Sequence, residues 1–286
     1  MTTLSPRDIV TQNIDLVSLP EIVIKLNEMV NDPLSTAADM GAVISQDPAL
    51  SGRLLKIVNS SFYGFPSHID SISLAITILG TRQLRDLVLA TAVIRRFRGS
   101  AIHAFNIDAF WRHSLCCAVS ARAFAGRLRV SNRERYFVAG LLHDIGKMVL
   151  YLVMPEQARE LIQRASEPGV SIAELERQVF FGIDHAEVGA ELLRQWRLPE
   201  SLIEPVRFHH TPHLATQFAR EAAVIHLANG IANTLQPVVP GEGTEEYDPR
   251  AWAMLEMTAE ILDSLLEEVN TQLGETIQLL YYDQAA

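Results

Sequence analysis

Hydrophobic residues recur at the spacing of an α-helix along almost the whole chain. After Ser18, for example, Ile22, Val23 and Leu26 share one helical face, with Pro20 suited to the first turn. No stretch alternates apolar and polar residues between hairpin turns, which is the pattern of β-strands. The pattern therefore predicts an all-α fold.

Capping and turn residues predict where individual helices begin and end. Asp47 before Pro48 is typical of a helix start, and Gly80 is typical of a helix end. From Tyr136 to Leu152 the apolar residues form one long run, which predicts a single helix. Other polar residues in front of apolar runs predict helix starts at Ser35, Asp108, Ser131 and Asp184.

The periodic pattern weakens around residues 98 to 107, which indicates a domain boundary. Residues 1–98 are expected to form an N-terminal helical bundle, and residues 99–235 a core of longer helices that is richer in histidine. Residues 236–286 are expected to contain a Pro- and Gly-rich linker and a C-terminal acidic helix that packs on the core.

Acidic residues outnumber basic ones, 34 against 24, and the formal net charge is −10. A chain with this charge repels polyphosphate backbones, so non-specific nucleic-acid binding is not expected. The same charge disfavours a helix-turn-helix interpretation of Ser35 to Ser60. The arginines at 82–85 and 95–98 are most simply explained as a solvated helix face.

Cellular location is expected to be cytoplasmic, without a membrane anchor. The first residues contain no apolar leader segment, and the most apolar run, Met148 to Met154, is too short to cross a bilayer. Cys116 and Cys117 are adjacent in an apolar stretch, where they read as reduced packing residues and not as a disulfide framework or zinc motif.

The segment Gly140 to Lys147 carries the strongest chemical signal. On a helix His143, Asp144 and Lys147 can face one pocket, since they are three and four residues apart. An imidazole beside a carboxylate can bind a divalent metal, and a nearby ammonium group can hold a phosphate oxygen. Apolar neighbours strengthen this interpretation, because polar groups among them need partners.

This segment, read as Leu-Leu-His-Asp-Ile-Gly-Lys, resembles the signature of the HD phosphohydrolase superfamily. His113 lies where the first ligand histidine of that family falls. The blocks Gln46 to Leu50, Leu54 to Tyr63 and Ala75 to Gly80 are similar to the HDOD variant in particular. The resemblance covers roughly residues 15–235 and implies an HD-like helical bundle with an N-terminal helical subdomain.

Three later histidines resemble those of HD-GYP relatives, which bind two or three metals and cleave cyclic di-GMP. His185 stands at the start of a predicted helix, and His209 and His210 form a doublet, as in those enzymes. The Gly-Tyr-Pro loop that names that family is absent, since residues 211–216 read Thr-Pro-His-Leu-Ala-Thr.

Two further positions depart from the family's ligand set. Asn229 stands where the last metal-binding aspartate falls, and Ala109 stands where some multi-metal relatives carry a glutamate. An asparagine offers only a neutral oxygen, so the site loses one negative charge and is expected to bind a cation less tightly.

Taken together, the resemblance implies a divalent metal site. Imidazole and carboxylate ligands suit Fe, Mn, Zn or Ni, with Mg as a further candidate, and the sequence does not select among them. His68, His103, His213 and His226 match no ligand position and are expected to be surface or structural residues. The expected metal ligands are His113, His143, Asp144, His185, His209, His210 and Asn229.

Several functions are compatible with this resemblance. As an HDOD relative, the chain is expected to be a bacterial signalling protein that binds a protein partner. The aromatic loop Phe62 to Pro66 offers either a contact surface or a plug for the bundle. The alternative is a metal-dependent phosphohydrolase, a phosphodiesterase acting on a nucleotide or phosphoester, with Asp144 and Lys147 as catalytic residues. A sensor that binds a nucleotide-like ligand without cleaving it lies between the two. The departures at Asn229 and Ala109 favour the non-enzymatic functions.

Overall fold

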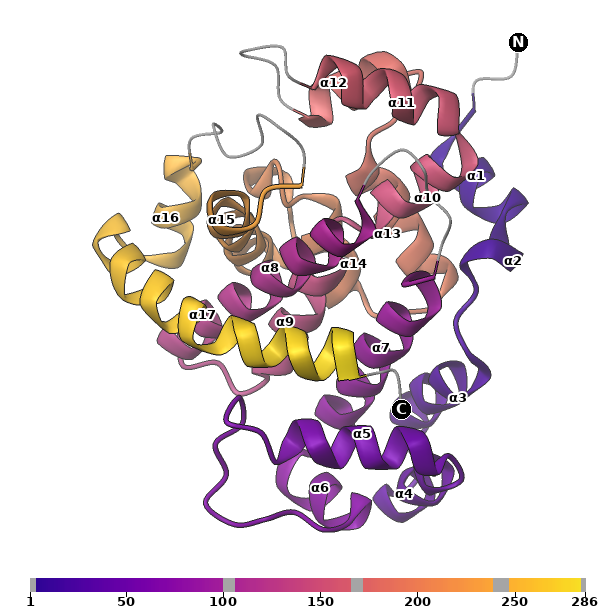
Figure 1. Cartoon of the computed structure of the whole chain (residues 1–286), viewed down its shortest axis with the longest axis vertical. Coiled ribbons are helices and arrows are strands. Elements are labelled where there is room, and N and C mark those ends of the chain that lie inside the picture. The colour runs from indigo at the N-terminus through magenta and orange to yellow at the C-terminus, as the bar shows by residue number, and fades with distance from the viewer. Residues whose placement is uncertain (1–3, 100–105, 166–171, 239–246, 284–286) are drawn as a thin grey trace. The chain divides into compact units, whose positions relative to one another are not determined.

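The structure is a computed structural model and describes residues 4–99, 106–165, 172–238 and 247–283. All regular elements within these residues are helical, so the predicted all-α fold is confirmed (Figure 1). The chain forms two compact units, one of Met1–Ser18 with Arg98–Val269 and one of Leu19–Phe97 with Asn270–Ala286.

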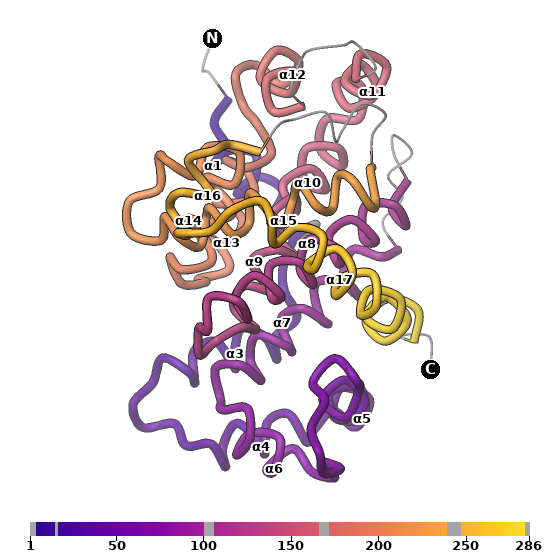
Figure 2. Tube along the Cα trace, turned by 90° about the vertical axis from the view of Figure 1, so that its left-hand side faces the viewer, coloured from indigo at the N-terminus to yellow at the C-terminus, as the bar shows by residue number. Residues whose placement is uncertain are grey.

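The larger unit is built around the long helix α8, which packs against α9 and α15 (Figures 1 and 2). Large apolar side chains such as Trp111, Phe110 and Phe124 are fully buried, so most of α8 lies in the core of this unit. The α-helices of this unit are α1 (Pro6–Gln12), α2 (Ile14–Val17), α8 (Ile107–Arg127), α9 (Arg133–Leu142), α10 (Ile145–Val153), α11 (Pro155–Arg164), α12 (Ile172–Val179), α13 (His185–Gln195), α14 (Glu200–Arg207), α15 (Ala219–Leu235) and α16 (Pro249–Leu255).

The smaller unit buries the apolar faces of shorter helices against α7. The Asp47 side chain caps α5 by accepting a hydrogen bond from the Leu50 amide, as predicted. Gly80 ends α6 with a φ of +90°, which is easily adopted only by glycine. The helices of this unit are α3 (Glu21–Asn31), α4 (Ala37–Ser45), α5 (Pro48–Val58), α6 (Ile72–Leu79) and α7 (Thr81–Phe97), joined by the end of α17 (Leu262–Ile277) and a π-turn (Gln278–Tyr282).

The division into units differs from the linear one expected from the sequence at both ends. Residues up to Ser18 cluster with the larger unit, where the Trp196 indole donates a hydrogen bond of 2.8 Å to the Val17 carbonyl oxygen. Residues from Asn270 cluster with the smaller unit, where Glu275 accepts a hydrogen bond from the Ser61 amide. Of the expected linker 236–250, residues 239–246 lie outside the described residues.

Three expected helix starts are shifted by one or two residues. The caps are Thr36, Asn106 and Asn132, in place of Ser35, Asp108 and Ser131. In each case another polar side chain, next to the expected residue or two positions before it, accepts the hydrogen bond from the first turn. Ser35 instead donates to Asp32. The expected start at Asp184 is confirmed.

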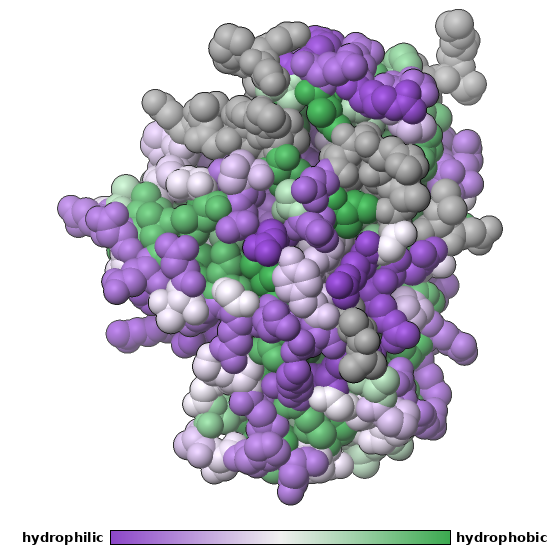
Figure 3. Space-filling model, in the orientation of Figure 1, coloured by the Kyte–Doolittle hydropathy of each residue, from purple (hydrophilic) through white to green (hydrophobic). Residues whose placement is uncertain are grey.

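By length and composition, the 21 residues of Arg133–Val153 pass as a possible membrane span, with a mean hydropathy of 1.4 over an 18-residue window. This stretch is longer than the apolar run Met148 to Met154, which is by itself too short to cross a bilayer. However, 89% of its apolar window is buried inside the protein, as in the core helix of a soluble domain. On the face drawn in Figure 3, hydrophilic and hydrophobic residues are interspersed over the surface.

Candidate metal centre

The predicted single helix from Tyr136 to Leu152 is interrupted at the two residues of the His-Asp pair. Helix α9 ends at Leu142 and α10 begins at Ile145, with Asp144 in the turn at φ −99° and ψ 5°. Neighbouring residues on a regular helix point about 100° apart. Because the helix breaks here, His143 Nε2 lies 3.4 Å from Asp144 Oδ2 and both side chains face one site.

The first group of the site consists of His113, His143 and Asp144, with Asn229 beside them. His113 comes from α8 and Asn229 from α15, the two helices that pack together in the core. His113 Nε2 lies 3.3 Å from His143 Nε2, and Asn229 Oδ1 lies 3.1 and 3.2 Å from these two nitrogens. All four side chains are buried.

The second group consists of His185, His209 and His210. His185 is the first residue of α13, and the histidine doublet follows the end of α14. His185 Nε2 lies 3.2 Å from His209 Nε2 and 3.1 Å from His210 Nε2. In each of the two groups of three, one ligand atom per residue lies within 4.8 Å of the others, as a metal site requires.

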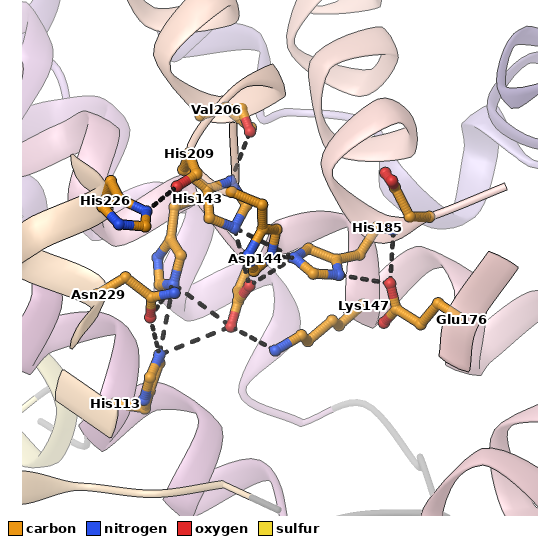
Figure 4. A network of polar contacts seen from close by, with 12 residues as sticks. His113, His143, Asp144, Lys147, Glu176, His185, Val206, His209, His226 and Asn229 are labelled. Atoms are coloured by element: carbon orange, nitrogen blue, oxygen red, sulfur yellow. Dashed lines mark hydrogen bonds and ion pairs between the residues drawn. The ribbon is translucent and has the colours of Figure 1, made fainter. Parts of the chain in front are cut away.

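Asp144 connects the two groups (Figure 4). Its Oδ1 lies 3.0 Å from His185 Nε2, and its Oδ2 lies 3.6 Å from His113 Nε2. Lys147 Nζ donates a hydrogen bond of 2.8 Å to the same Oδ2. The structure therefore brings all seven predicted ligands into one cluster, which is buried except for the half-buried His210, with the predicted lysine at its edge.

Hydrogen bonds on the outer ring nitrogens orient the histidines toward the cluster. Nδ1 of His113, His143 and His209 contacts the backbone carbonyl oxygens of Gln236, Gly140 and Val206, at 3.0, 2.7 and 2.7 Å. A carbonyl only accepts, so each Nδ1 carries a proton, and in the neutral form of each ring the Nε2 lone pair points inward. Several nitrogen lone pairs and a carboxylate thus converge, and this donor set fits a divalent transition metal.

Glu176 is a participant that was not recognised from the sequence. Its Oε2 lies 2.5 Å from His185 Nδ1 and accepts a second hydrogen bond from the His185 amide. A carboxylate on the outer nitrogen of a ligand histidine holds the ring in place and makes it more basic. The available signal was its position on the apolar face of α12, in register with Ile172 and Val179, where it is fully buried.

The pKa values of the cluster differ sharply between its members. Burial lowers the pKa of His143 to about 4, so this ring is neutral near pH 7. Burial alone would also lower the pKa of His185, but the carboxylates of Glu176 and Asp144 outweigh it and raise the value to about 10. Burial would raise the pKa of Asp144, whereas the neighbouring imidazoles and Lys147 hold it well below its usual value.

The histidines expected to be structural lie apart from the cluster or support it. His226 bonds through Nδ1 to the His209 carbonyl oxygen and accepts the Asp248 amide proton at Nε2, so neither nitrogen is directed at a metal. His213 and His68 are exposed. His103 lies outside the described residues.

The fold and cluster define an all-helical protein related to the HD phosphohydrolases, and residues 16–212 match the HDOD domain. The chain therefore belongs to the HDOD domain family. An uncharacterised protein of Treponema pallidum is 27% identical over 268 residues, which cover 90% of this chain and 51% of that protein. The chain thus spans about half the length of this relative.

Solved structures show the same fold. An HDOD domain protein of Geobacter sulfurreducens superposes with a TM-score of 0.78 at 22% identity, over 96% of this chain and 98% of that one. A protein of Shewanella amazonensis, named as a candidate phosphohydrolase, superposes with a TM-score of 0.72 at 26% identity, over 97% and 98% of the two chains. The HD-like helical bundle expected from the sequence is thereby confirmed.

Proposed function

We propose that this protein is a metal-binding regulatory protein, which acts by binding a signalling partner or a nucleotide-like ligand and not by rapid turnover. The observation that carries the proposal is the convergence of inward-facing histidine nitrogens on Asp144. Membership of the HDOD family supports a regulatory role. The neutral side chain of Asn229 supports weak or absent catalysis, because it removes one negative charge from the site.

A second candidate function is metal-dependent phosphoester hydrolysis. A divalent cation held by these histidines and Asp144 would supply an activated water at neutral pH. Lys147 would then stabilise the charge of the phosphate. Against this role, the Lys147 ammonium already pairs with Asp144 Oδ2 at 2.8 Å, so part of its charge is committed to the carboxylate.

A cytoplasmic location is part of the same proposal. The apolar stretch of α9 and α10 is explained by burial in the core, where it supplies His143 and Asp144 to the cluster. The metal is a divalent ion from the Fe, Mn, Zn, Ni and Mg set, with the nitrogen-rich donors favouring the transition metals.

A turnover assay separates the two candidate functions. The protein is loaded with Mn²⁺ and incubated with bis(p-nitrophenyl) phosphate, next to Lys147→Met and Asp144→Asn. We expect no release of p-nitrophenolate above the rate of the Asp144→Asn variant. Release by the wild type that is abolished in both variants would establish the hydrolase and overturn the regulatory proposal.

A further inference from the structure

We propose that the cluster holds one divalent cation per chain, in the second group of His185, His209 and His210 with Asp144, because Asn229 closes the first group by hydrogen bonds. The inference rests on the proposed function, since it concerns the same cluster. The second group is then the metal site, and the first group is held together by hydrogen bonds without a metal.

The first group can satisfy its own lone pairs. His113 and His143 donate their Nδ1 protons to backbone carbonyls, so in the neutral rings both Nε2 atoms are acceptors, and the Asn229 head group lies 3.1 and 3.2 Å from them. A carboxamide turned by 180° presents its NH₂ group in nearly the same space. Asn229 can therefore donate to both histidines without a metal, whereas an aspartate at this position would add only further acceptors.

Lys147 adds to the difference in cation affinity between the two groups. Its ammonium pairs with Asp144 Oδ2, which is the oxygen that faces His113 and His143. The negative charge on the side of the first group is thus offset by a cation that belongs to the protein. The other oxygen, Oδ1, faces His185 at 3.0 Å and can act as a ligand for a cation in the second group. A dication is repelled from the first group more than from the second.

In the second group the inner nitrogens face one another. His209 donates its Nδ1 proton to the Val206 carbonyl, and His185 directs its Nδ1 at the Glu176 carboxylate. Their Nε2 atoms lie 3.2 Å apart, with His210 Nε2 at 3.1 Å from that of His185. A proton on His185 Nε2 points at one acceptor at a time, and Asp144 Oδ1 at 3.0 Å competes for it, so it cannot also satisfy the Nε2 atoms of both His209 and His210. One divalent cation satisfies all three histidines together with Asp144.

Equilibrium dialysis against Mn²⁺, with electron paramagnetic resonance of the bound ion, tests this assignment. We expect one Mn²⁺ per wild-type chain with the six-line spectrum of an isolated ion. In Asn229→Asp we expect two ions with an exchange-coupled spectrum. Two ions in the wild type, or only one in Asn229→Asp, would overturn this inference but leave the proposed function standing. No bound ion in either protein would overturn both the inference and the proposed function.

His143 and His209 provide a matched pair of variants that keeps the test independent of Asn229→Asp folding. Both rings are fully buried, and both bond through Nδ1 to the carbonyl three residues earlier at 2.7 Å. We expect His143→Gln to retain one Mn²⁺ and His209→Gln to bind it at least roughly tenfold more weakly. Equal loss of Mn²⁺ in the two folded variants would overturn the assignment to the second group.

Discussion

Asp144 Oδ1 lies 3.0 Å from His185 Nε2, and this contact links the two groups of histidines, which come from distant parts of the chain. The two residues meet because α10 and α13 pack closely, with Gly146 and Gly189 at the point of contact. The carboxylate also faces His143 through its other oxygen. The candidate metal centre therefore depends on the packing of α10 against α13 as much as on the ligands themselves.

Replacing Gly146 by alanine should damage this packing. An added Cβ would overlap the His185 carbonyl oxygen and lie 2.7 Å from the Gly189 nitrogen, both of which are backbone atoms. We expect Gly146→Ala to lower the free energy of unfolding by about 3 kcal/mol or more, measured by urea denaturation. Gly52→Ala is the control, since its Cβ would meet nothing within 4 Å, and it should be neutral or stabilising. Equal effects of the two variants would contradict the close-packing argument.

Glu176→Gln should weaken metal binding without removing a ligand. The amide keeps the shape of the side chain but loses the charge that raises the pKa and basicity of His185. We expect the affinity for Mn²⁺ to fall by roughly 10- to 100-fold, measured by equilibrium dialysis. Glu187→Gln, on the partly exposed side of α13, should leave the affinity unchanged. An unchanged affinity in Glu176→Gln would show that Glu176 does not support the centre.

Acid should destabilise the metal-free protein in part through His143. Burial lowers the pKa of His143 from its ordinary value of 6.5 to about 4 in the folded state. Between these values the unfolded chain binds a proton that the folded chain does not, so stability falls as the pH drops from about 6.5 toward 4. We expect a shallower loss in His143→Gln, followed by urea denaturation in EDTA at several pH values. Parallel curves for the two proteins would contradict this assignment.

Glu204 should hold the segment between the histidine doublet and α15. Its carboxylate accepts hydrogen bonds from the backbone amides of Thr216, Gln217 and Phe218, at 2.7, 3.0 and 2.5 Å. We expect Glu204→Ala to lower the free energy of unfolding by about 2 to 3 kcal/mol, because three backbone donors lose a charged acceptor together. Glu200→Ala, exposed at the start of the same helix, should change it by less than about 0.5 kcal/mol.

Much of the helical architecture could be predicted because it depends on local signals. The helix starting at Pro48 and the end of α6 at Gly80 follow from one residue each. The break at His143 and Asp144 could not be predicted, because the apolar pattern runs through it and neither residue is a proline or a glycine. There the geometry is set by contacts with side chains from other helices, which local propensity does not contain.

The membership of the cluster was predictable only through family resemblance, since spacing along the chain does not place His113 beside Asn229. The structure then adds the directions of the side chains, which a sequence motif does not contain. The inward direction of each Nε2 follows from outer hydrogen bonds to backbone carbonyls such as that of Gly140. Glu176 was missed because a glutamate on a helix usually lies on the solvated face, and only its apolar register indicated burial.

Metal content tests the central claim most directly. The wild-type protein and Asp144→Asn, which keeps the size of the side chain, are loaded with Mn²⁺ and dialysed, the metal is measured by elemental analysis, and folding is checked by circular dichroism. We predict one ion per wild-type chain and none in Asp144→Asn, because the carboxylate is the anionic side chain that contacts histidines of both groups. A wild-type protein that stays metal-free, or a folded variant that retains the ion, would contradict the account.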